Sequence, residues 1–344
     1  MKRLLVVKLS SFGDVLHALP VIKSIKNDLP DLSIGWVVRK RCAGLVQDCG
    51  FIDNIHIVED KPGLGDLMKL RSDLRREKYD TAFDMQGLFL SGLITALSGA
   101  KRRVGLNRNR ELNAAFLTEA DVEGKKPITH AIDVQLGFRR SAGLGPVSDL
   151  PSLSHLGSGS DSWYAGVVPS EESTPVVVLN VGASTIYKRW PIDRWIELAN
   201  AVTSAGARVI LTAGPSEADD AFEIAGRISP SALLTNLGGK TTPDQLASVL
   251  SHSDVVITGD TGPMHLAAAL GKTVIALFGP TDPRLTGPYG NNHKVIWKQI
   301  SCSPCFRHPT CGGRVDCLTS ITADEVFRAL CDVLSERKNC SAIA

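Results

Sequence analysis

The sequence predicts an α/β protein made of two doubly wound domains, each a parallel sheet with helices on both faces. Three observations support this prediction. The chain has 344 residues, which is long for a single hydrophobic core and typical of two domains. Short apolar runs alternate with helical patterns, as in the repeated strand and helix units of a parallel sheet. A segment rich in Gly, Ser and Pro at 145–173 interrupts the alternation, which then starts again.

The elements of the first half begin with the apolar run 3–8. A short polar turn follows it, and then Val15, Leu19, Ile22 and Ile25 recur at the spacing of an amphipathic helix. Polar or glycine turns separate the later runs, which supports the same alternation. Further strands are expected at 33–38, 54–58, 79–85 and from residue 103, with helices near 40–49 and at 88–98.

The second half repeats the pattern from residue 175 onward. Strands are expected at 175–181, 207–213, 232–236, 254–258 and 273–278, and helices at 191–205, 216–228, 243–251, 263–270 and 322–338. Asp324 and Glu325 lie in the first turn of the last helix, where carboxylates interact favourably with the helix dipole. We place the domain boundary in the linker, which gives domains 1–160 and 161–344.

The composition excludes several classes of protein. Hydrophobic residues make up 43% of the chain and charged residues 22%, as in ordinary globular proteins. The formal charge of +2 gives no general reason to expect a nucleic acid partner. Lys8 and Asp14 interrupt the apolar start before the core of a signal peptide could form. No apolar stretch approaches the roughly 18 residues of a transmembrane helix, so we expect a cytoplasmic protein.

The turn after the first strand places a carboxylate at the start of the first helix. It reads Ser10-Ser11-Phe12-Gly13-Asp14. In a parallel sheet such a turn lies at the carboxyl edge, where ligands bind. Asp14 could cap the helix, or it could be a general base that takes a proton from an attacking hydroxyl. The spacing alone leaves both interpretations open.

Segment 182–191, GASTIYKRWP, follows the first strand of the second half and has the residue types of a phosphate site. The hydroxyl of Ser184 and the point charge of Lys188 could hold phosphate oxygens. The segment is not a Walker A sequence, and it could also be a solvated basic loop.

Segment 259–265, GDTGPMH, lies between an apolar strand and an apolar helix. Its backbone N–H groups face outward from a helix N-terminus, which is an anion site. Asp260 could cap the helix or accept backbone hydrogen bonds, and His265 could donate to a phosphate or simply pack.

Five segments, in this order and spacing, resemble the lipopolysaccharide heptosyltransferases of glycosyltransferase family 9. They are KLSSFGDVLHALP, FDMQGL, YKRWP, GDTGPMHLAAAL and GPTDP, and the match covers nearly the whole chain. The first motif and region 79–140 are most similar to heptosyltransferase I. The resemblance implies the GT-B fold, in which two Rossmann-like domains face a central cleft. It also implies transfer of heptose from ADP-L-glycero-D-manno-heptose to the Kdo and heptose inner core, with inversion by a single displacement.

The resemblance further implies roles for single residues. Asp14 matches the proposed base of the family. The residues that match donor-binding positions are Ser184, Lys188, Glu217, Asp260, Thr261, Gly262 and His265. No metal or other cofactor is required for this reaction. The implied partners are ADP-heptose and Kdo-lipid A or inner-core lipopolysaccharide, with peripheral contact at the cytoplasmic face of the inner membrane.

Candidates for binding the acceptor lie in the first half. Ser10, Ser11 and Gly13 occupy a turn that a ligand could approach closely. Gln86 and His130 could reach the acceptor, or each could fasten a loop. Five basic residues could meet acceptor carboxylates and phosphates or form a solvated face: Lys101, Arg102, Arg103, Arg108 and Arg110.

Four of the eight cysteines crowd into one segment, as Cys302, Cys305, Cys311 and Cys317. Four thiolates can enclose a tetrahedral ion, so we expect a structural zinc or iron, with reduced thiols or a disulfide as alternatives. The segment resembles a Cys-rich segment of heptosyltransferase II-like proteins and, more loosely, the metal-binding finger of autotransporter heptosyltransferases. Heptosyltransferase I members usually lack it.

Three other functions fit parts of the pattern. The phosphate-binding residues would also suit another nucleotide sugar. An oxidoreductase is less well supported, because no GxGxxG fingerprint follows the first strand. A non-catalytic, metal-linked protein on the same scaffold is disfavoured by the presence of both Asp14 and Lys188.

Overall fold

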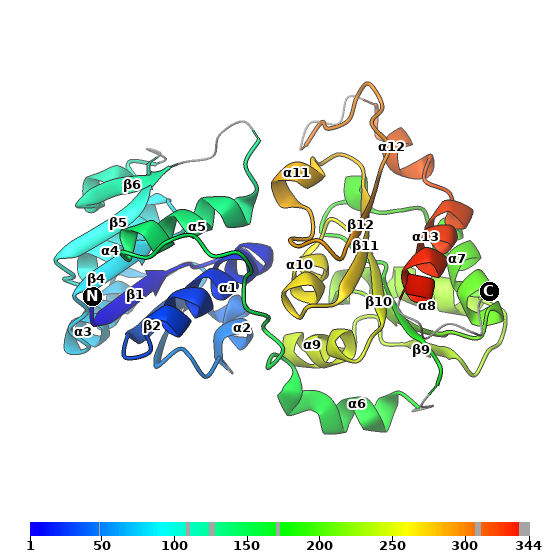
Figure 1. Cartoon of the computed structure of the whole chain (residues 1–344), viewed down its shortest axis with the longest axis horizontal. Helices are drawn as coiled ribbons and strands as arrows, with labels where there is room; N and C mark the ends of the chain where they lie inside the picture. Colours follow the sequence, from blue (N-terminus) through cyan, green and yellow to red (C-terminus); the bar gives the residue numbers. More distant parts are fainter. Residues whose placement is uncertain (48, 108–110, 124–127, 170–172, 307–310, 337–344) are drawn as a thin grey trace. The chain divides into compact units, whose positions relative to one another are not determined.

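The computed structural model describes residues 1–47, 49–107, 111–123, 128–169, 173–306 and 311–336. The chain divides into two compact units, Met1–His155 and Leu156–Ala344 (Figure 1). The break follows His155, whereas the sequence predicted it after residue 160. Each unit contains one six-stranded sheet, and every neighbouring strand pair is parallel. The predicted α/β class is confirmed.

The sheet of unit 1 has the strand order β3-β2-β1-β4-β5-β6. The central strand β1 is buried on both faces, with Leu4, Leu5, Val6 and Val7 fully enclosed. The strands are β1 Arg3–Val7, β2 Ser33–Arg39, β3 Asn54–Val58, β4 Thr81–Asp84, β5 Arg102–Asn107 and β6 Glu119–Glu123. The α-helices are α1 Phe12–Asp28, α2 Gly44–Gln47, α3 Leu64–Arg76, α4 Phe89–Leu97 and α5 Ala131–Ser141. Helix α1 packs on α5 and α3 packs on α4, and the two pairs cover opposite faces of the sheet (Figure 1).

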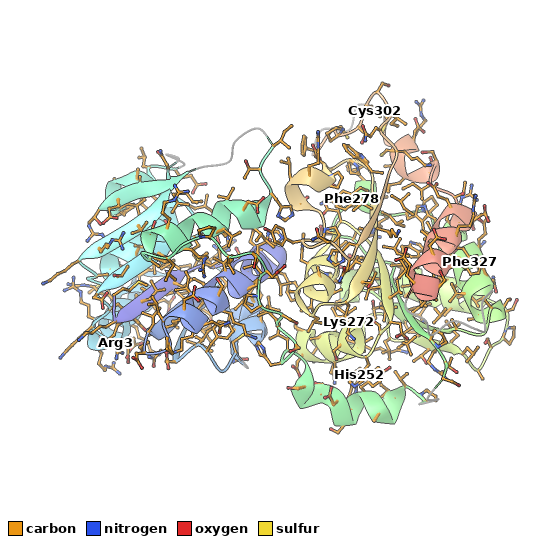
Figure 2. All side chains as sticks on the ribbon, viewed as in Figure 1. Arg3, His252, Lys272, Phe278, Cys302 and Phe327 are labelled. Atoms are coloured by element: carbon orange, nitrogen blue, oxygen red, sulfur yellow. The ribbon has the colours of Figure 1, made fainter. Side chains whose placement is uncertain are left out.

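The sheet of unit 2 has the equivalent order β12-β11-β10-β7-β8-β9. Its core joins the strands to the buried faces of α7 and α13, which also pack on each other. The strands are β7 Val176–Asn180, β8 Arg208–Thr212, β9 Leu234–Asn236, β10 Val255–Gly259, β11 Thr273–Phe278 and β12 Lys294–Trp297. The α-helices are α6 Asp161–Val167, α7 Ile192–Ser204, α8 Ala218–Arg227, α9 Pro243–Ser251, α10 Gly262–Ala269, α11 Pro283–Thr286, α12 Asp316–Thr319 and α13 Ala323–Glu336. Figure 2 shows Phe278 on β11 and Phe327 on α13.

Several elements differ from the prediction. The helix expected near 40–49 is a 3-10 turn at Lys40–Cys42 followed by the short α2. The expected linker at 145–173 contains α6. Elements that the sequence did not predict are α3, β6, α5, α11, β12 and α12. In β6 the sequence Glu-Ala-Asp-Val-Glu carries too little apolar character to be recognised, as is common in edge strands.

The strand order of each sheet reverses direction at one point. In unit 1 the chain moves outward from β1 through β2 to β3 and then returns to β4, beside β1. In unit 2 the same reversal brings β10 beside β7. Ligands of open α/β sheets bind outside the carboxyl ends of the strands at such points. In the described part of the chain, no helix combines the length and apolar character needed to cross a membrane.

Candidate active site

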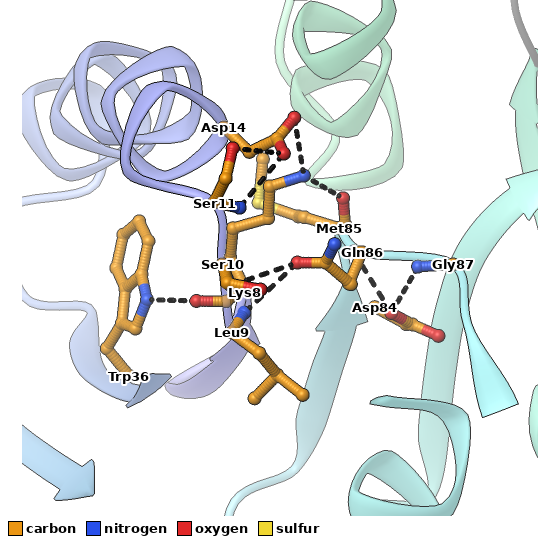
Figure 3. Close-up of polar contacts among 10 residues, drawn as sticks. All are labelled: Lys8, Leu9, Ser10, Ser11, Asp14, Trp36, Asp84, Met85, Gln86 and Gly87. Carbon is orange, nitrogen blue, oxygen red and sulfur yellow. Dashed lines mark hydrogen bonds and ion pairs between the residues drawn. The ribbon is translucent and has the colours of Figure 1, made fainter. Parts of the chain in front are cut away.

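Asp14 lies in the first turn of α1, just beyond the carboxyl end of β1. Ser11 is the N-cap residue, directly before α1, and its backbone N–H and its hydroxyl both donate to Oδ2 of Asp14 at 2.9 Å (Figure 3). The Asp14 carboxylate therefore accepts a backbone N–H group at the N-terminus of α1. The side chain remains 47% exposed, so a substrate can still reach it.

Lys8 follows β1 and lies beneath Asp14. Lys8 is only 3% exposed, and its ammonium donates to the carbonyl of Met85 at 2.9 Å. The ammonium nitrogen is 3.9 Å from Oδ1 of Asp14. Figure 3 shows it pointing between the two acceptors.

The electrostatic surroundings of Asp14 favour its charged form. Burial opposes ionisation, but the positive charge of Lys8 and the two hydrogen bonds from Ser11 outweigh this effect and hold the pKa of Asp14 below its ordinary value. His17, one turn further along α1, adds a smaller effect in the same direction. The carboxylate is therefore ionised at neutral pH.

The loop after β4 supports the loop after β1. Oε1 of Gln86 accepts the backbone N–H groups of Leu9 and Ser10 at 3.2 and 3.3 Å. Oδ1 of Asp84 accepts those of Gln86 and Gly87 at 3.1 and 2.9 Å. Burial raises the pKa of Asp84, against the effect of these hydrogen bonds. Gln86 thus fastens a loop, which was one of its two expected roles.

The remaining acceptor candidates are dispersed. His130 begins α5, where its Nδ1 accepts the N–H of Ile132 at 3.1 Å, and its ring meets that of His17 edge to face. Arg103 lies near the amino end of β5 and donates to two backbone carbonyls. The structure therefore does not bring Arg103 to Asp14. Arg102 pairs with Glu119, and Lys101 is exposed. Arg108 and Arg110 lie outside the described residues.

In unit 2, the loops after β7 and β10 are joined by an ion pair. The ammonium of Lys188 lies 2.6 Å from Oδ2 of Asp260. Below this pair, the amide of Asn180 donates to Thr258 and Thr261 at 3.0 and 3.3 Å. Thr261 is the N-cap residue, directly before α10. These contacts hold the ammonium of Lys188, in the loop after β7, beside the N-terminus of α10, which follows β10.

Glu217 approaches the same edge from the loop after β8. Its side chain is 10% exposed, and Arg189 reaches it at 3.3 Å. A Cβ atom at Gly182 or Gly214 would come within 3.2 or 2.7 Å of Oε2 of Glu217. The two glycines thus leave space for a carboxylate between β7 and β8.

The other predicted donor residues surround these contacts. Ser184 is exposed, Gly262 is the first residue of α10, and His265 is half-buried one turn later. The structure brings Lys188, Asp260 and the start of α10 together, with Glu217 in the loop after the neighbouring strand β8.

Arg189 was not predicted, although it lies within the YKRWP motif. Its guanidinium donates hydrogen bonds to the carbonyl of Ala183 and to the carboxylates of Asp220 and Glu217. Lys8 was also missed as a site residue. Its signal in the sequence is a lysine at the end of an apolar strand.

The cysteine segment follows β12 and ends with Cys317 in α12, and Figure 2 labels Cys302. Cys317 is buried, whereas Cys302, Cys305 and Cys311 are half-buried. Burial, with Cys302 and Cys305 nearby, raises the pKa of the Cys317 thiol to about 11. Among the described residues, no three His, Cys, Asp or Glu side chains lie in an arrangement that could hold a metal ion. The metal site stays a prediction from the cysteine spacing.

The chain matches one protein family over most of its length. The model of glycosyltransferase family 9 (heptosyltransferase) matches residues 67–314. The lipopolysaccharide core heptosyltransferase OpsX of Haemophilus influenzae is 28% identical over 301 residues, which cover 86% of this chain and 84% of the relative.

Two solved structures from E. coli have a similar fold. ADP-heptose lps heptosyltransferase II has a TM-score of 0.81 and 24% identity, covering 98% of this chain and 99% of that structure. The heptosyltransferase WaaC with ADP has a TM-score of 0.76 and 25% identity, covering 96% and 99%.

Proposed function

The chain belongs to glycosyltransferase family 9, the heptosyltransferase family, and from this membership we propose the reaction and the roles of its residues. It is a glycosyltransferase of the heptosyltransferase type that acts in lipopolysaccharide core synthesis. We propose that its donor is ADP-L-glycero-D-manno-heptose. The proposed acceptor is the Kdo and heptose inner core on lipid A, and the proposed stereochemical course is inversion.

The observation that carries the proposal is the Asp14 carboxylate at the reversal point of unit 1. It is accessible, and its surroundings favour the ionised form. A general base must be ionised and within reach of the hydroxyl that it deprotonates. These properties are those that an inverting transferase requires of its base.

The proposed reaction is a single displacement. Asp14 accepts the proton of an acceptor hydroxyl as that oxygen attacks the anomeric carbon of the heptose. The bond between the anomeric carbon and the diphosphate oxygen breaks, and ADP leaves. Lys188 and the backbone N–H groups at the start of α10 stabilise the negative charge that grows on the diphosphate.

The proposed donor site uses the loops after β7, β8 and β10. The ammonium of Lys188, paired with Asp260 in this structure, would turn to the diphosphate when the donor binds. Glu217, in the space beside Gly182 and Gly214, would accept hydrogen bonds from the ribose hydroxyls. Ser184, Thr261, Gly262 and His265 complete the proposed donor contacts.

The proposed acceptor is a lipid-linked saccharide. An enzyme that acts on it must meet the membrane in which the lipid is held, so we propose peripheral contact with the cytoplasmic face of the inner membrane. Ser10, Ser11 and Gly13, beside Asp14, are the proposed acceptor contacts. Gln86 supports them by holding the N–H groups of Leu9 and Ser10.

Donor choice can be tested by comparing nucleotide sugars at one acceptor concentration. Initial rates would be measured with ADP-heptose, ADP-glucose, UDP-glucose and GDP-mannose, using Kdo-lipid A as the acceptor. We expect the highest kcat/KM for ADP-heptose. A higher value for another nucleotide sugar would contradict the proposed donor.

A further inference from the structure

Lys8 is a buried cation that directly follows the apolar strand β1 of unit 1. The preceding residues of β1 are fully enclosed, and Lys8 itself is 3% exposed. Removing an ammonium from water is unfavourable unless it gains hydrogen bonds and an opposite charge. A neutral residue would pack here at lower cost, so the presence of lysine points to a role beyond packing.

The backbone of Lys8 is fixed by its neighbour β2. Its N–H donates to Val37 O at 3.3 Å, and its own carbonyl accepts the indole N–H of Trp36 at 3.2 Å. The ammonium donates to Met85 O, which follows β4. Because these contacts come from both sides of β1, the ammonium is held at one position under Asp14.

The two oxygens of Asp14 have different surroundings. Oδ2 receives both hydrogen bonds from Ser11. Oδ1 lies 3.9 Å from the Lys8 ammonium, which is close enough for strong attraction but beyond hydrogen-bond distance. Oδ1 can thus accept a hydrogen bond from a substrate hydroxyl, while the positive charge of Lys8 attracts it electrostatically.

We propose that Lys8 is a positioning residue, which orients Oδ1 of Asp14 and keeps the carboxylate ionised until the acceptor hydroxyl arrives. The inference rests on the proposed function, in which Asp14 is the base. In the forward step the proton moves from the acceptor hydroxyl to Oδ1. The protonated acid then lies beside a fixed positive charge, which favours release of the proton to water and restores the base.

Other titratable groups near this pair belong to four elements. Cys42 lies in the 3-10 turn after β2, where burial raises the pKa of its thiol and the charge of Asp14 adds a smaller effect in the same direction. His17 lies on α1, one turn after Asp14, and its ring contacts that of His130 at the start of α5. Asp84 lies at the end of β4, directly before Met85. Asp84 is held by the N–H groups of Gln86 and Gly87.

The test replaces Lys8 by Met, which removes the charge, and by Arg, which keeps it. Lys23→Met is the matched control, because Lys23 also lies near Asp14 in sequence, on α1, and its ammonium also donates to a backbone carbonyl, that of Ser152. The pKa of Asp14 would be measured by carboxyl ¹³C NMR, with its signal assigned from Asp14→Asn. The pH dependence of kcat/KM would be recorded for each variant.

For Lys8→Met we expect a higher Asp14 pKa and an acid limb of kcat/KM displaced to higher pH, so that the loss of activity is greatest at low pH. Lys8→Arg should restore much of both properties, and Lys23→Met should match the wild type. The Kd for ADP should not change, because the proposed donor site lies in unit 2. If Lys8→Met does not fold, Lys8→Gln replaces it, since a glutamine amide can still donate to Met85 O.

An unchanged Asp14 pKa in a folded Lys8→Met or Lys8→Gln variant would overturn the proposal, even if activity fell. The NMR titration does not depend on turnover. A wild type without transferase activity would therefore contradict the proposed function, while the titration would still decide the effect of Lys8 on Asp14.

Discussion

Of the two roles that the sequence left open for Asp14, the structure contains the contact at the start of the helix, and the role of base stays a proposal. Its Oδ2 holds the N–H of Ser11 and so caps α1, while Oδ1 faces the Lys8 ammonium. A capping carboxylate is fixed in position by the helix that it caps, and a general base gains from a fixed position. The cap therefore supports the proposed catalytic role.

Replacing Asp14 by Ala should separate the two roles. We expect kcat to fall by about 10²- to 10⁴-fold, the usual contribution of a general base, with little change in the Kd for ADP-heptose. Loss of its capping-box contact should lower the free energy of unfolding by about 0.3–1.5 kcal/mol. Steady-state kinetics, calorimetric titration and urea denaturation would measure these three quantities.

Asp66→Ala is the matched control for the cap. Asp66 accepts the N–H of Gly63 at 2.8 Å at the start of α3, as Asp14 accepts that of Ser11. This variant should lose similar stability and keep its kcat. If both variants lost the same fraction of kcat, or if Asp14→Ala turned over normally, Asp14 would not be the base.

Lys188 is the cation expected to meet the diphosphate. In Lys188→Ala, the Kd for ADP-heptose should rise by about 10- to 100-fold, since hydrogen bonds to charged groups contribute about 1.5–3 kcal/mol. Transfer should slow in parallel, because the same charge stabilises the leaving group. Lys294→Ala serves as the control, because Lys294 also pairs with a carboxylate, Glu336, but lies at the amino end of β12. Equal donor affinity in the two variants would remove Lys188 from the phosphate site.

At the scale of elements, the buried strands were predicted well because their sequences are apolar without interruption. The expected strand at 175–181 corresponds to β7 and that at 273–278 to β11. Elements that cover the sheet were harder to predict. Helix α3 buries only Leu70 and Leu74, and its many charged residues conceal the apolar spacing.

Strand β2 contains a glycine that its packing requires. A Cβ atom at Gly35 would overlap the phenol oxygen of Tyr79, which is hydrogen-bonded to His56 at 2.8 Å. Gly35→Ala should therefore lower the free energy of unfolding by about 1–3 kcal/mol, the usual cost of overpacking.

Gly65→Ala should have the opposite effect in the same unit. Gly65 lies in α3 with no atom near its would-be Cβ, and Ala in a helix is more stable than Gly by about 0.5–1 kcal/mol. Urea denaturation of both variants would check the pair. A stable Gly35→Ala protein would show that Tyr79 can move without cost.

The cysteine segment predicts a bound metal that elemental analysis can test. Protein purified without chelator should contain stoichiometric zinc or iron if the four thiolates form the site. Cys305→Ser should lose the metal, whereas Cys42→Ser in unit 1 should keep it. A metal-free wild type would leave the segment as reduced thiols or a disulfide.

At the scale of the whole molecule, the sequence predicted the loops that carry the site better than the contacts among them. The motifs were correctly expected after strands, at the carboxyl edge of a sheet. The strand order, which depends on contacts distant in sequence, brings the loop of Gln86 beside that of Ser10. The same order places Met85 next to Lys8. No local pattern specifies these neighbours, so a lysine at the end of an apolar strand does not by itself reveal the role that we propose for Lys8.

The most direct test of the proposed function is the product formed from ADP-heptose and Kdo-lipid A. Mass spectrometry would count the sugars added, and NMR would assign the new linkage and its anomeric configuration. We predict release of ADP and addition of heptose to Kdo, with the anomeric configuration opposite to that of the donor. Retention of configuration, or hydrolysis of ADP-heptose without transfer to either Kdo-lipid A or an inner core that already carries heptose, would contradict this account.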